Sequence, residues 1–99
     1  MPEAGSRLAA DARPRLAPKV RLRWDRKDGR YMLLYPERGL VLNGTAAEVV
    51  KLCTGEHTVA AIIARLAGQY ADQPADAIER EVLGFLHAMV DRGLIRSEP

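Results

Sequence analysis

The stretch Tyr31–Thr58, YMLLYPERGLVLNGTAAEVVKLCTGEHT, contains the signals that decide the fold. Aromatic and aliphatic residues dominate Arg30–Tyr35, a composition typical of a strand. Pro36 and Gly39 fit a tight turn, and Leu40–Leu42 then form a very short strand. The stretch therefore predicts a strand, a turn, a short strand and a capped helix.

Two capped helices are expected after the short strand. Thr45 and Glu48 match a capping box, in which each side chain satisfies a free N–H at a helix start, so a helix is expected over 46–53. Thr58 suits the N-cap of a second helix, whose apolar residues recur at i, i+3, i+4 and i+7 from Val59 onward.

A third helix is expected from Pro74 to Arg92. Proline suits the first turn of a helix, and Gly93 suits the left-handed residue of a Schellman ending. At about 100° per residue, the apolar arc of this helix spans roughly 160°. Leu83 and Val90 form its margin, beyond the stripe that a core contact requires.

A hairpin precedes the short strand. Lys19–Asp25 alternates between apolar and charged residues, as in a half-buried strand, and Gly29 suits the following turn. No periodicity is visible in residues 1–17, which are expected to form a flexible arm. The remaining order predicts one α+β domain over residues 18–96. This domain is a small three-stranded antiparallel sheet followed by three helices, similar to a winged helix-turn-helix.

Composition narrows the classes of function. The 99 residues suffice for one domain with one modest core. A single cysteine excludes an intrachain disulfide and fits a reducing compartment, and the chain shows no secretory signal or membrane span, so a cytoplasmic protein is expected. Residues 1–38 carry ten Lys or Arg and five Asp or Glu, against five and eight in residues 39–99. The basic first part either attracts an acidic partner or is simply a solvated segment.

No catalytic residue, metal site or cofactor is expected. Cys53 continues the apolar stripe of the first helix, so a small buried hydrophobe is favoured over a nucleophile. His57 and His87 lack the spacing of metal-binding motifs. Three acids at the start of the third helix are explained by the helix dipole. These observations favour a binding protein over an enzyme.

The short strand is the candidate binding site. If its edge is unpaired, an extended peptide can join the sheet there as an added strand. Its side chains would then insert against the margin of the third helix, unless that margin covers the first helix instead. The same edge also allows a homodimer by edge pairing or strand exchange. The predicted peptide-binding residues are Arg38, Gly39, Leu40, Val41, Leu42, Leu83, Leu86 and Val90.

A winged-helix DNA-binding regulator is the alternative function, because the helix order resembles a helix-turn-helix. A helix that reads DNA usually carries several cationic or amide side chains. Residues 58–70 contain one arginine and one glutamine, and residues 74–92 contain four acids and two arginines. Nucleic acid is therefore not the expected partner.

The residues LLYPERGLVLN (33–43), Thr45-Ala46 and the pattern Leu52, Cys53, Gly55, Thr58, Val59 resemble the PqqD family of peptide chaperones in pyrroloquinoline quinone biosynthesis. Val82, Phe85, Leu86 and the closing Gly93-Leu94-Ile95 also fit. The resemblance covers about 14–95. Thr54 and Glu81 stand where aspartate is common in relatives, which affects caps or surface more than the predicted binding site.

The resemblance implies a non-catalytic function. Members of the family bind the leader of a ribosomal precursor peptide and present it to a radical S-adenosylmethionine (SAM) enzyme, which cross-links a Glu and a Tyr of that peptide. Related domains hold leaders as an added strand between the third strand and the third helix. The resemblance implies no catalytic residue and no cofactor on this chain.

Overall fold

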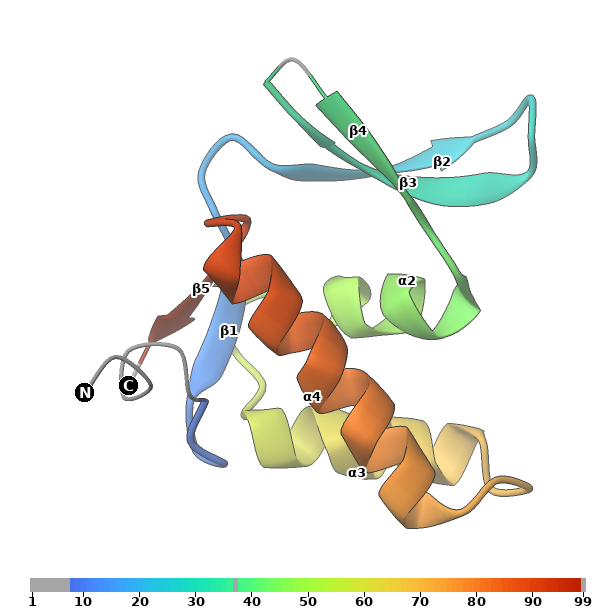
Figure 1. The fold of residues 1–99 in the computed structure, drawn as a ribbon, viewed down its shortest axis with the longest axis vertical. Helices are drawn as coiled ribbons and strands as arrows, with labels where there is room; N and C mark the ends of the chain where they lie inside the picture. Colours follow the sequence, from blue (N-terminus) through green and yellow to red (C-terminus); the bar gives the residue numbers. More distant parts are fainter. Residues whose placement is uncertain (1–7, 37, 99) are drawn as a thin grey trace.

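An antiparallel sheet in the order β2-β3-β4 lies over three helices in the computed structural model, which describes residues 8–36 and 38–98 (Figure 1). The strands are β2 (Arg21–Asp25), β3 (Arg30–Tyr35) and β4 (Arg38–Leu42). The predicted bounds of β3 are confirmed, and β4 begins two residues before the predicted Leu40. The α+β class, with the sheet before the helices, is also confirmed.

The three helices are α2 (Gly44–Lys51), α3 (Val59–Gln69) and α4 (Ala75–Asp91). Thr58 caps α3 as predicted, because its Oγ1 accepts the N–H of Ala61 at 3.0 Å. The Schellman ending of α4 is also confirmed. Gly93 has φ +75°, and the N–H of Leu94 donates to the carbonyl of Met89 at 2.9 Å.

The start of α2 differs from the predicted capping box. Asn43, in extended conformation, is the N-cap, and its Oδ1 accepts the N–H of Ala46 at 2.8 Å. The helix therefore begins before Thr45, and Glu48 instead pairs with Lys51 at 3.1 Å. Asparagine caps at least as well as threonine, so the earlier residue ends β4 and starts the helix in one step.

A second, two-stranded sheet joins the two ends of the described chain. β1 (Arg13–Leu16) pairs antiparallel with β5 (Ile95–Glu98). Of the arm expected over 1–17, residues 1–7 lie outside the described residues, and 13–16 form this strand instead of irregular chain. In β1, Pro14 is buried, whereas its neighbours Arg13 and Arg15 are exposed. The pairing partner is about 80 residues away, so no local periodicity reveals it.

The core lies between the β2-β3-β4 sheet and the helices, with α2 at its centre. α2 packs against β3 and β4 on one side and against α3 and α4 on the other (Figure 1). Leu33 of the sheet, Val49 of α2 and Ile62 of α3 are fully buried. Each such side chain contributes about 1.5–3 kcal/mol relative to an exposed one. This packing fixes β4 above the helices.

Two glycine substitutions should shift stability in opposite directions. Gly93→Ala forces a Cβ into a left-handed residue and should destabilise the fold by about 1–2 kcal/mol. Gly84→Ala, in the middle of α4 with no atom within 4 Å of the added Cβ, should stabilise it by about 0.5–1 kcal/mol. Urea unfolding followed by circular dichroism measures both, and equal shifts would contradict the assigned ending of α4.

Candidate functional site

β4 lies at one end of the three-stranded sheet and pairs only with β3 among the described residues. Its side chains differ sharply in exposure: Val41 is 45% exposed and Leu42 is 5% exposed. Leu40 is half-buried, and Arg38 and Gly39 are exposed. The strand thus anchors on the core through Leu42 and leaves its outer edge open.

Two residues of β4 direct their backbone groups away from β3. Tyr35 pairs with Arg38 across a two-residue turn, so this pair exchanges the first hydrogen bonds of the hairpin. In an antiparallel ladder, alternate residues point their N–H and C=O to opposite sides. Gly39 and Val41 therefore present four backbone groups at the open edge, as an added strand requires.

The residues expected from α4 differ in burial and in their neighbours. Leu86 is fully buried and Leu83 is half-buried. Leu83 lines a hollow of about 410 Å³ together with Ile63 of α3 and Leu8, and no residue of β4 lines it. Leu83 therefore lies on the α3 side of α4, and its predicted contact with a bound peptide stays a prediction. Val90, one heptad later and half-buried, continues the same flank.

Phe85 occupies the opposite flank of α4. At about 100° per residue, it lies roughly 160° around the helix from Leu83. Phe85 is half-buried and packs against the core. The apolar arc alone does not say which margin of the helix faces the sheet.

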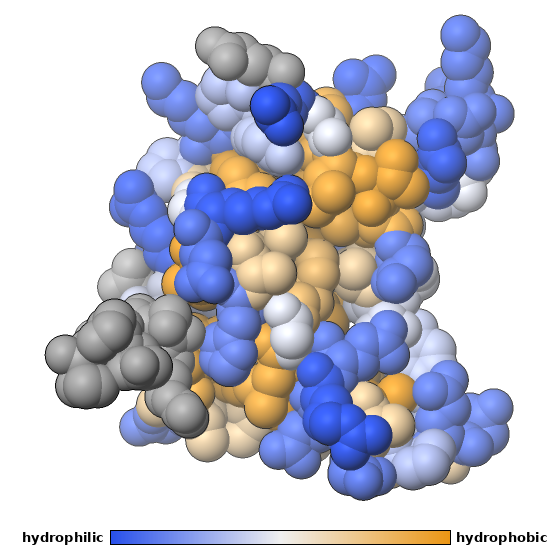
Figure 2. Space-filling model, viewed as in Figure 1, coloured by the Kyte–Doolittle hydropathy of each residue, from blue (hydrophilic) through white to orange (hydrophobic). Residues whose placement is uncertain are grey.

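The surface between β4 and α4 is largely hydrophobic. Figure 2 shows hydrophobic residues over β4, and this surface continues toward α4, with charged side chains around it. Contiguous exposed apolar surface with a polar rim is typical of a binding site. The open backbone edge and this surface adjoin each other and together form the candidate site.

Lys51, at the end of α2, contacts the inner face of the sheet near this site. Its Nζ lies 4.6 Å from the centre of the Tyr31 ring, a cation–π contact. Hydrogen bonds to Glu48 and then to Tyr31 raise the pKa of the Lys51 ammonium, which therefore stays charged at neutral pH. The contact joins the end of α2 to the inner face of the hairpin.

The candidate nucleophile is buried, and the two histidines lie in different parts of the fold. Cys53 is 3% exposed, and burial raises the pKa of its thiol from 9.0 to about 12. His57 precedes α3, whereas His87 lies on α4. Within residues 8–36 and 38–98, no three His, Cys, Asp or Glu side chains gather to hold a metal ion. None of the described helices has the length and hydropathy needed to span a membrane.

The fold and the open edge define a small α+β recognition domain. Residues 30–95 match the family model described as coenzyme PQQ synthesis protein D (PqqD). A PqqA binding protein of Methylococcus capsulatus is 36% identical over 89 residues, which cover 90% of this chain and 92% of the relative. One of Rhodopseudomonas palustris CGA009 is 39% identical over 88 residues, covering 89% and 85%. The chain belongs to the PqqD family, and the predicted resemblance is confirmed.

Two solved structures share the fold. One is the PqqD part of Methylobacterium extorquens PqqCD, a stand-alone recognition element for ribosomally synthesised and modified peptides. It has a TM-score of 0.75 and 32% identity, and the match covers 93% of this chain and 97% of that one. The other is a lasso peptide synthetase B1 in complex with its leader peptide, with a TM-score of 0.71, 23% identity and coverage of 86% and 99%. The second likeness concerns the fold alone.

The buried thiol gives a direct test of the non-nucleophilic assignment. At pH 8, a disulfide reagent should label Cys53 in the folded protein at least about 100-fold more slowly than in urea, because only opened molecules react.

Because the folded pKa is raised, the thiol's contribution to stability is complete below pH 9 and is lost as the pH rises toward 12. Cys53→Ala should remove that part of the pH dependence. Equal labelling rates in the two states would indicate a reactive cysteine.

Proposed function

We propose that this chain is a non-catalytic peptide chaperone that binds the precursor peptide PqqA and presents it to a modifying enzyme. The observation that carries the proposal is the open edge of β4 in a chain that is 36% identical to a PqqA binding protein over most of its length. The leader of the peptide adds to the β2-β3-β4 sheet as a fourth strand, with Arg38–Leu42 as its pairing partner. The modifying enzyme is a radical SAM enzyme, as the family resemblance implies.

Backbone pairing supplies affinity with little dependence on peptide sequence. Gly39 and Val41 offer two N–H and two C=O groups, so up to four hydrogen bonds form. At about 1 kcal/mol net each, they contribute roughly 4 kcal/mol. A disordered leader also loses conformational entropy when it becomes a strand. This cost lowers the net affinity, so the bound peptide is readily released.

Side-chain selectivity comes from the surface between β4 and α4. Alternate side chains of an added strand point to opposite faces of the sheet. We expect those that point toward the helices to meet α4 at Phe85, beside Leu40. Leu86 is fully buried and Leu83 lines the hollow on the α3 side, so we expect Leu83, Leu86 and Val90 to contribute less than Phe85.

The alternative of a DNA-binding regulator finds no support. The proteins that this chain resembles are peptide-recognition proteins, and α3 carries Arg65 as its single cation. An edge-paired or strand-exchanged homodimer remains an expectation of the open edge. It would compete with the leader for β4, so excess peptide should dissociate it.

Val41→Pro should reduce binding of a labelled PqqA leader at least tenfold, because it deletes one of the two outward N–H groups of β4 and with it one or more hydrogen bonds to the peptide. Val41→Ala is the matched control: it shortens the same side chain, keeps the N–H and should bind within about threefold of wild type. Isothermal calorimetry measures both, with circular dichroism to verify folding. A folded Val41→Pro variant with unchanged affinity would disprove strand addition at β4.

A second pair of variants tests which flank of α4 the peptide touches. Phe85→Ala should weaken leader binding about tenfold through loss of apolar contact, whereas Leu83→Ala should leave it within about twofold. Both remove a half-buried side chain from α4, so the stability of each is measured alongside binding. The reverse order of effects would place the peptide on the α3 flank.

A further inference from the structure

The outward face of the β2-β3-β4 sheet carries a regular arrangement that neither the core nor the peptide edge uses. The register defines two rows across the strands: Arg23, Met32 and Val41 in one, and Arg21, Leu34 and Gly39 in the other. Each row thus begins with a guanidinium on β2 and becomes apolar or bare toward β4. The three helices lie on the other side of the sheet (Figure 1).

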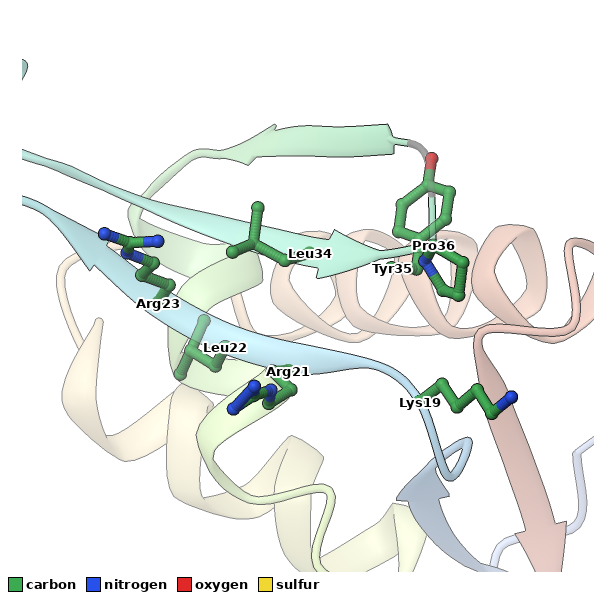
Figure 3. A pocket seen from close by; sticks show the side chains of 7 residues that line it. All are labelled: Lys19, Arg21, Leu22, Arg23, Leu34, Tyr35 and Pro36. Atoms are coloured by element: carbon green, nitrogen blue, oxygen red, sulfur yellow. The ribbon is translucent and has the colours of Figure 1, made fainter.

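Along β2 this face is hollowed and positively charged, and the hollows reach the edge of the strand, where Leu22, Trp24 and Tyr35 also line them. Two hollows, of about 560 and 410 Å³, lie along β2 and meet at Arg23 and Leu34. Figure 3 shows the larger one, with the cationic side chains of Arg21 and Arg23 on β2 and that of Lys19 on the segment before it. The charged residues that line the two hollows are five cations and one acid, namely Lys19, Arg21, Arg23, Arg26, Lys27 and Asp25. None of these cations forms an ion pair with a described acidic side chain.

The apolar part of the face is maintained by Gly39. A Cβ at this position would lie 3.1 Å from the Met32 Cε and 3.3 Å from the Leu34 Cδ2. These two side chains therefore extend over the bare backbone of Gly39, next to Val41, which is 45% exposed. The result is an apolar strip on β3 and β4, bordered by the guanidinium groups of β2.

We propose that this outward face is a docking surface for an acidic surface of a protein, one whose carboxylates flank an apolar centre. The occupant is the modifying enzyme that receives the peptide, so the inference rests on the proposed function. Carboxylates match the unpaired guanidinium groups in charge and in bidentate geometry. A nucleic acid backbone would satisfy the cations but would leave Met32, Leu34 and Val41 against phosphate and sugar.

The position of the face gives docking a function. It ends at β4, whose backbone edge accepts the leader, so an added strand would extend the same face by about 4.8 Å. An enzyme held on this face would lie beside the bound peptide without contacting the α4 side of the candidate site. Docking and peptide capture therefore use different groups of the same sheet and can be separated by mutation.

The test compares two double variants of equal charge change. Arg21→Glu/Arg23→Glu reverses the outward face, and Arg65→Glu/Arg96→Glu reverses two exposed arginines on α3 and β5. Surface plasmon resonance measures binding of the purified radical SAM enzyme, with and without the PqqA leader, and calorimetry measures leader binding alone. The first variant should lose at least tenfold in enzyme affinity and keep its leader affinity, and the second should keep both. Met32→Gln should also weaken enzyme binding, through the apolar strip.

The possible failures are distinguishable. Equal enzyme binding by wild type and Arg21→Glu/Arg23→Glu would overturn the docking surface and leave peptide capture intact. A wild type that binds the enzyme but not the leader would instead reject the proposed function. Tighter binding of wild type to a 20-base-pair duplex than to the enzyme, abolished by the same double variant, would reassign the face to nucleic acid and overturn the inference.

Discussion

Four buried side chains of α2 hold the sheet against the helices, and the open edge of β4 depends on this contact. Ala46, Ala47, Val49 and Val50 are each at most 8% exposed, and their helix packs on β3 and β4 as well as on α3 and α4. A three-stranded sheet needs one covered hydrophobic face to be stable. Because α2 supplies that cover, β4 stays in place without a second pairing strand in residues 8–36 and 38–98.

β4 therefore has three uses in five residues. Leu42 points into the core, the backbone of Gly39 and Val41 faces the edge, and the side chain of Val41 faces outward. An open edge also risks pairing with other copies of the protein. Here the strand is short and begins with a charged residue and a glycine, which limits a long, flat contact with a second sheet. Selective capture of one peptide is then compatible with a short, exposed edge.

The sequence predicted local features well and long-range ones poorly. Thr58, Gly29 and Gly93 specify a cap or a left-handed residue through their own chemistry, and all three were confirmed. The capping box at Thr45 failed because Asn43 competes for the same helix start. The β1–β5 pair was missed because its partners lie at opposite ends of the chain. The strand part of the candidate site follows from turn chemistry, whereas the side of α4 on which Leu83 lies depends on how α3 packs, which periodicity does not encode.

The β1–β5 pair also determines how the domain responds to force. Arg13 pairs with Glu98, and Leu16 with Ile95, so both ends of the described chain leave the pair on the same side. Tension that separates these ends would load one backbone pair at a time, as in a zipper, and not all four together. The junction should therefore peel open under a weak pull, whereas the β2-β3-β4 sheet, which lies between these strands in the chain, would bear load only after the junction had opened.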